Sequence, residues 1–137
     1  MKNRTPFLLL SIVLLSILSG CKKERIRKKY AGDFTFTING TYSYLNQPTT
    51  DTTIEYQGTI EVLDKDPYDS KANDVRLKIF YEKSNSYVIP IVQTKGLLEC
   101  PNPTISGSFS DNDHVHFTVE YRSLSYYYYE DVSGVRR

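Results

Sequence analysis

Residues 34–44 read Phe-Thr-Phe-Thr-Ile-Asn-Gly-Thr-Tyr-Ser-Tyr, so apolar or aromatic side chains alternate with polar ones. Successive side chains of a β-strand point to opposite faces of a sheet, and this period of two predicts a strand with one buried face. The same alternation recurs along the chain, at 54–62, 75–81, 87–91, 105–109 and 115–121. The sequence therefore predicts an all-β domain.

The dipeptide Asn39-Gly40 favours a different local structure, because it is typical of a tight hairpin turn. A turn there would break the even parity that the apolar positions keep from 34 to 44. We therefore predict one long strand with Gly40 at a bend, paired with residues 54–64 across a loop at 45–53. This register places Gly40 opposite Gly58, as a sharply bent pair of strands requires.

Short, turn-forming connections separate the predicted strands, which indicates an antiparallel meander of about seven to eight strands. A sheet of this size hides its edges by closing on itself or by splitting into two layers. We expect a small closed or partly open barrel, with a β-sandwich as the alternative. A lipocalin-like barrel is the nearest familiar architecture, although this chain has no Trp and so lacks the Gly-x-Trp start of that family.

The N-terminus has the three zones of a signal peptide. Lys2 and Arg4 give a positive start, residues 7–18 form an apolar run, and Ser19-Gly20-Cys21 comes directly after it. The run is shorter than the roughly 20 residues that a membrane-spanning helix needs. The three zones therefore predict a signal peptide rather than a permanent membrane-spanning anchor.

Leu18-Ser19-Gly20-Cys21 resembles the lipobox of bacterial lipoproteins. The resemblance implies that 1–20 is a signal peptide with a signal helix and that Cys21 is lipidated and then acylated at its amine. It also implies a lipid anchor in the cell envelope. Segment 21–29 would be a basic tether, and 30–137 a single β domain. The alternative is an ordinary secretory signal in which the cysteine stands by chance.

The residues after Cys21 bear on the side of the membrane that the protein faces. Lys22-Lys23-Glu24-Arg25 offers one acidic residue among bases. In the Bacteroidota lipoproteins that this start resembles, acidic residues soon after the lipidated cysteine direct export to the cell surface. The same resemblance therefore predicts an outer-membrane lipoprotein that faces the periplasm.

The body contains three loose motifs: Tyr30-x-Gly32-x-Phe34-x-Phe36, Ile105-x-Gly107-x-Phe109 and Val132-x-Gly134-x-Arg136. In these motifs the body resembles the small β-rich lipoproteins of unknown function that are common in Bacteroidota. They imply a type of fold rather than an activity.

The charges of the chain are unevenly distributed. Without Lys2 and Arg4 the chain has 15 basic and 16 acidic residues, but residues 22–29 contain six basic residues and one acidic residue. From Tyr30 onward, nine basic residues stand against 15 acidic ones. A basic stem beside a lipid anchor suits anionic headgroups, or forms a solvated tether. An acidic body argues against nucleic acid as a partner.

Cys100 is the only cysteine apart from Cys21, so lipidation of Cys21 leaves no pair for an intramolecular disulfide. Glu99 and Pro101 give Cys100 none of the positive surroundings that activate a thiol. We expect Cys100 to be a small buried residue at the end of a strand.

His114 and His116 flank Val115 on one predicted strand, so both imidazoles project from the same face. Such a pair can supply two zinc ligands, with Asp111, Asp113 or Glu120 adding an oxygen. The apolar residues take the opposite parity, however, which favours a solvated polar face for both histidines.

Tyr126 to Tyr129 is the most unusual stretch, because four tyrosines on one strand place two on each face. Together with Tyr121, the residues Tyr126 and Tyr128 could form an aromatic platform for a sugar, a peptide or a lipid. The pattern favours, instead, a heavily buried last strand whose hydroxyl groups reach the rim of the sheet.

Two further segments resemble known sites only weakly. Asp51-Thr52-Thr53 is similar to the O-glycosylation acceptor of secreted Bacteroidota proteins, and we expect Thr52 to lie in an exposed loop. Residues 64–74 are rich in carboxylates but lack the glycine and the final glutamate of a calcium loop, which favours a plain hairpin connection.

No catalytic motif is readable from the spacing of the residues, so we expect no enzyme and no cofactor. Two hypotheses of function remain. The first is a non-catalytic interaction or structural module that is bound to the membrane through Cys21 and contacts another envelope protein. The second is a lipocalin-like carrier of a small apolar or sugar ligand.

Overall fold

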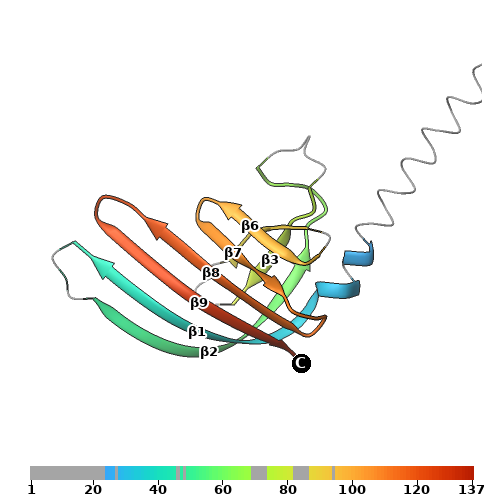
Figure 1. The fold of residues 1–137 in the computed structure, drawn as a ribbon, viewed down its shortest axis with the longest axis horizontal. Helices are drawn as coiled ribbons and strands as arrows, with labels where there is room; N and C mark the ends of the chain where they lie inside the picture. The colour runs from blue at the N-terminus through green and yellow to red at the C-terminus, as the bar shows by residue number, and fades with distance from the viewer. Residues whose placement is uncertain are drawn as a thin grey trace, which may run out of the picture.

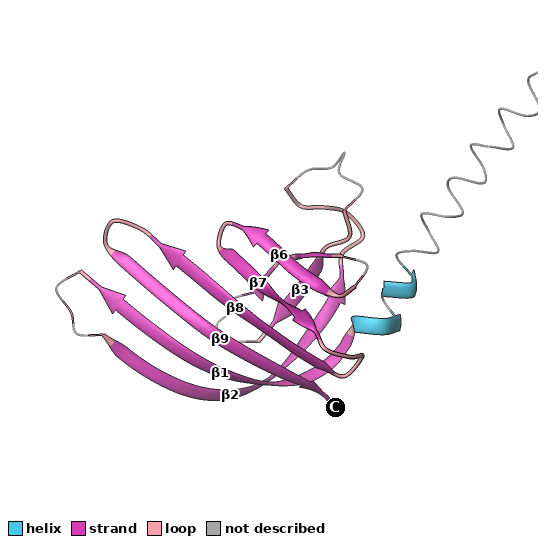
Figure 2. Ribbon diagram, viewed as in Figure 1, coloured by secondary structure: helices cyan, strands magenta, loops and turns pink. Residues whose placement is uncertain are grey.

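The computed structural model describes residues 24–26, 28–45, 47, 49–68, 74–81, 87–93 and 95–137. The signal segment and Cys21 lie outside the described residues. The described part is an all-β domain, as the alternation predicts (Figure 2). Its strands are β1 (Gly32–Tyr44), β2 (Thr50–Val62), β3 (Leu77–Phe80), β4 (Tyr87–Val88), β5 (Ile91–Val92), β6 (Leu97–Pro101), β7 (Thr104–Phe109), β8 (His114–Arg122) and β9 (Tyr126–Arg136).

All nine strands belong to one antiparallel sheet with the order β4-β3-β2-β1-β9-β8-β7-β6-β5. The sheet curls so that its two ends approach each other (Figure 1). A bridge between Arg76 and Ile91 joins the two ends, with backbone hydrogen bonds from Leu77 N to Pro90 O (3.0 Å) and from Val92 N to Val75 O (2.8 Å). The result is a partly open barrel rather than the two-layer sandwich that was the alternative.

β1 is the single long strand that its even parity predicts, with Gly40 in its interior. Its register against β2 differs from the prediction, because Gly40 lies opposite Thr52 and it is Phe34 that lies opposite Gly58. β2 starts at Thr50, so the loop ends earlier than expected; the threonines that begin β2 favour strand structure. The shift is six residues. Since six is even, every side chain keeps its predicted face.

Gly58 is a position where the structure requires glycine for close approach. A Cβ at this position would lie 1.8 Å from the carbonyl oxygen of Phe80, which is far inside van der Waals contact. The end of β3 therefore passes directly over β2 at Gly58. Any side chain at this position would push the two strands apart.

The core lies on the concave side of the sheet. Phe34, Phe36 and Phe117 are fully buried there, and Tyr81 meets the ring of Phe117 edge to face at 5.6 Å. Burial of each phenylalanine stabilises the fold by about 1.5–3 kcal/mol. Cys100 is also buried, near the end of β6, as expected.

The segment expected to be a tether is partly a structural element. Residues 24–26 and 28–30 are helical, and Ile26 and Tyr30 belong to the core cluster. The ring of Tyr30 lies 4.2 Å from that of Phe109. The boundary predicted at residue 30 therefore needs correction, because the folded body already includes Ile26. The apolar side chain of Ile26 within a basic run is the feature that packs the helix against the barrel.

Arg136 holds this helix against the sheet. Its guanidinium donates hydrogen bonds to the carbonyl oxygens of Lys29 (2.7 Å), Ala31 (3.0 Å) and Asn112 (2.7 Å). The helix and the C-terminus thus lie together at one end of the barrel (Figure 1). Within the described residues, the structure contains no helix of the length and apolar character needed to cross a membrane.

Candidate functional site

Two long hairpins extend beyond the packed core, at the end of the molecule away from the N-terminal helix (Figure 1). We call their outer parts the arm; it comprises residues 39–44 of β1, 50–54 of β2, 118–122 of β8 and 126–131 of β9. Strand pairing between β1 and β9 joins the two hairpins along their length. A backbone hydrogen bond from Leu45 N to Ser125 O, 2.9 Å long, also links their tips.

The concave face of the arm is lined by tyrosines. Tyr121 and Tyr128 are cross-strand partners with stacked rings 5.7 Å apart. Tyr126 lies 5.8 Å from Tyr128 on one side and 6.3 Å from Tyr44 on the other. We call Tyr44, Tyr121, Tyr126 and Tyr128 the tyrosine ladder. The structure thus brings together the three tyrosines that the sequence singled out and adds Tyr44.

The ladder becomes more exposed toward the tips. Tyr128 is half-buried and packs against the core, whereas Tyr44 is 59% exposed. The four consecutive tyrosines of the last strand are each partly buried, so the strand is neither a fully exposed platform nor fully buried. Tyr127 and Tyr129, of the opposite parity, project from the convex face, where the Tyr127 ring lies 5.1 Å from the guanidinium of Arg122.

Glu130 lies where the ladder meets the core, and it is only 3% exposed. Its carboxylate accepts hydrogen bonds from the hydroxyl groups of Tyr42 (2.8 Å) and Tyr81 (2.6 Å). Burial of a carboxyl group costs free energy unless the group is hydrogen-bonded. The two tyrosine hydroxyls provide these hydrogen bonds. Glu130 is not among the residues predicted from the sequence. Its even parity, shared with Tyr128 and Val132, was the signal that places it on the core side.

Between the tips of the two hairpins the surface is hollowed by a cavity of about 390 Å³. Its apolar and aromatic lining comes from Tyr44, Leu45, Leu124, Tyr126 and Tyr127. Leu124 is fully exposed at the turn between β8 and β9. Exposed leucines and tyrosines that gather at one end of a molecule are characteristic of interaction surfaces.

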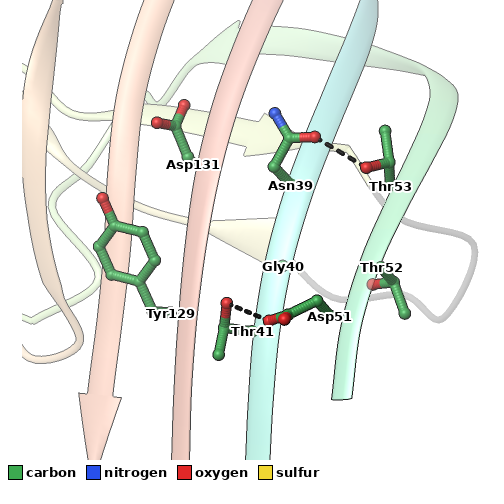
Figure 3. A pocket seen from close by; sticks show the side chains of 8 residues that line it. All are labelled: Asn39, Gly40, Thr41, Asp51, Thr52, Thr53, Tyr129 and Asp131. Atoms are coloured by element: carbon green, nitrogen blue, oxygen red, sulfur yellow. Dashed lines mark hydrogen bonds between the residues drawn. The ribbon is translucent and has the colours of Figure 1, made fainter. Parts of the chain in front are cut away.

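The convex face of the arm carries a second cavity, of about 450 Å³, which we call the outer pocket (Figure 3). Its lining is polar: Asn39, Gly40, Thr41, Asp51, Thr52, Thr53, Tyr129 and Asp131. Within it, Thr53 donates to the Asn39 side-chain oxygen at 3.0 Å, and Thr41 donates to Asp51 at 2.8 Å. Each of these two hydrogen bonds links a side chain of β1 to a side chain of β2.

His114 and His116 are both exposed, as their parity predicts. They do not share a carboxylate: His114 Nδ1 lies 2.9 Å from Asp111 Oδ2, and His116 Nε2 lies 2.8 Å from Asp131 Oδ1. Hydrogen bonds from the backbone N–H of Asp113, and then from the His114 side chain, lower the pKa of Asp111. The described residues contain no group of three or more His, Cys, Asp or Glu side chains placed to hold a metal ion.

The two segments with weak resemblances both contribute to the fold. Thr52 lies inside strand β2 opposite Gly40 and is half-buried, so its expected loop position is wrong.

In the loop after β2, Asp66 forms an ion pair with Arg76, and its side chain has no exposed surface. Arg76 also donates to the carbonyl oxygen of Ile89 at 3.2 Å. Asp66 thus holds Arg76 at the bridge to Ile91 that joins the two ends of the sheet.

The two faces of the arm carry different groups that suit binding. The concave face carries the phenol rings of the tyrosine ladder, and the convex face carries carboxylate, amide and hydroxyl groups.

Comparison of the chain with protein-family models, with curated proteins and with solved structures finds no match.

Proposed function

We propose that this protein is a non-catalytic binding module of the cell envelope, anchored through lipid on Cys21, which binds another envelope component through the tyrosine ladder. The observation that carries the proposal is the row of neighbouring, partly exposed tyrosine rings on the concave face of the arm. Tyrosine gives a large contact area at a low cost in side-chain entropy, and it is enriched at interaction sites.

The placement of the ladder supports an anchored module. Cys21 precedes the helical residue Glu24 by three residues, a length of chain that spans at most about 10 Å. A lipid on Cys21 would therefore keep the helical end of the barrel close to the bilayer, where Arg25, Lys28 and Lys29 suit anionic headgroups. The arm lies at the other end and would point away from the membrane (Figure 1).

The carrier hypothesis receives less support. At the closed end of the barrel, the inward-facing side chains pack against one another as one core cluster. Phe34, Phe36 and Leu77 have no exposed surface there. Among the described residues, these side chains occupy the inward face at this end of the barrel, where a carrier would hold its ligand.

Site-specific photocrosslinking in cells tests the ladder. A photoreactive residue in place of Tyr44 should give a discrete crosslinked product, and the same residue in place of the exposed Ser106 should not. Tyr121→Ser combined with Tyr126→Ser should abolish the product, whereas Tyr87→Ser, at an exposed tyrosine of β4 outside the arm, should leave it intact. Equal products from positions 44 and 106 would refute binding through the ladder.

A separate experiment tests the anchor. Cys21→Ser should abolish incorporation of labelled fatty acid and leave an unprocessed precursor. Recovery of a processed, detergent-extractable form of this variant would contradict lipidation at Cys21.

A further inference from the structure

Beyond the end of β3, the side of β2 that faces away from β1 has no strand partner among the described residues, in the arm and next to it. β3 pairs with β2 only from Thr59 to Val62. On that same side, among the residues that the structure describes, no strand pairs with β2 from Thr50 to Gln57. We call this stretch the free edge. In an antiparallel pair, every other residue directs its N–H and C=O groups away from the partner. Among the described residues, the free edge therefore offers a row of backbone donors and acceptors without a strand partner.

The side chains of the free edge divide by face. Asp51 and Glu55 are exposed on the convex face, and the free edge contains no Lys or Arg. On the concave face Ile54 is 51% exposed, and Tyr56 is half-buried next to it. A strand added here would therefore meet carboxylates on one face and apolar groups on the other.

The outer pocket opens beside the acidic face of the free edge. Asp51, Thr52 and Thr53 belong both to the free edge and to the lining of the outer pocket. Asp131 provides a second carboxylate in this lining, and Tyr129 provides an aromatic ring (Figure 3). The lining contains no basic side chain among the described residues. Carboxylates together with an aromatic face suit a guanidinium or ammonium group.

A second copy of this chain does not fit the free edge. Twofold pairing of two such edges would bring the Asp51 and Glu55 carboxylates of both copies to one face without a cation between them. Like charges on neighbouring strands destabilise a pair. The occupant must instead supply positive charge to that face.

We infer that the free edge of β2 receives an extended segment of a partner polypeptide, which adds as a further strand and alternates basic with apolar side chains. Its basic side chains lie over Asp51 and Glu55 and reach the outer pocket. Its apolar side chains contact Ile54 and Tyr56 and extend the concave surface of the tyrosine ladder. The inference rests on the proposed function and deepens it, because it specifies the chemistry of the partner.

A charge-swap experiment with two fluorescent peptides tests this inference. The first is a nine-residue peptide that alternates Lys with Val, and the second has Glu in place of each Lys. We expect the full-length protein in detergent to bind the Lys peptide about fivefold or more tightly than the Glu peptide, as measured by fluorescence anisotropy. Asp51→Lys combined with Glu55→Lys should reverse this preference.

Amide hydrogen exchange distinguishes strand addition from loose charge attraction. The bound Lys peptide should slow exchange of amides between Thr50 and Gln57, and not in β7. Equal binding of both peptides, protection of another strand, or no binding up to about 1 mM would overturn the inference. The proposed function has its own readout, because crosslinking from position 44 does not depend on either peptide.

Discussion

Replacement of Phe117 by alanine tests the assignment of faces on which the site depends. Phe117 has no exposed surface, and its ring meets Tyr81 edge to face. Removal of a phenylalanine ring from a packed core costs about 3–5 kcal/mol, of which the aromatic pair accounts for about 0.5–1.5 kcal/mol. A domain of this size has a free energy of unfolding of about 5–15 kcal/mol, so the loss is a large fraction of its stability.

Thermal and urea unfolding of the full-length protein in detergent measure this loss. At about 4 °C per kcal/mol, a cost of about 3 kcal/mol lowers Tm by about 12 °C. The urea midpoint should fall while the slope m stays unchanged, because the unfolded chain exposes the same surface.

Glu120→Ala is the matched control, since Glu120 lies on the same strand with opposite parity. Its side chain is about two-fifths exposed and forms an ion pair with the exposed Arg122, at 3.5 Å. The expected cost is about 0.5 kcal/mol or less. Equal losses at 117 and 120 would refute the reasoning, because they would mean that both faces of β8 are covered.

Three further predictions concern other contacts of the fold. Gly58→Ala should lower the free energy of unfolding by several times the ~0.5 kcal/mol of an ordinary surface change, since the new Cβ would overlap the Phe80 carbonyl oxygen; unchanged urea unfolding would contradict this close approach. His114→Ala combined with His116→Ala should change stability by about 0.5 kcal/mol or less, and a zinc-dependent rise in Tm that only the unsubstituted protein shows would reveal a metal site instead. The pKa of Asp111 is lowered in the folded state, so its contribution to stability is present above its ordinary pKa of 3.8 and is lost as pH falls through the folded value. An NMR titration midpoint of Asp111 at or above 3.8 would contradict this direction.

The alternation of the sequence determined the strands and their faces. Phe34, Phe36 and Val119 are buried as their parity requires, and His116 is exposed for the same reason. Even the wrong register between β1 and β2 left these faces unchanged, because the error was an even number of residues. Alternation constrains the face of every residue, but it leaves open every register that differs by an even number of residues.

Only the tertiary structure decided which strands meet and what the site contains. Glu130 is buried because Tyr42 and Tyr81, far away in sequence, supply its two donors. Ile26 joins the core because its helix packs against the barrel, where Tyr30 of the same helix meets the ring of Phe109. The physical reason is that a local pattern specifies which way a side chain points, whereas burial and hydrogen-bond partners depend on the strands that fold opposite it.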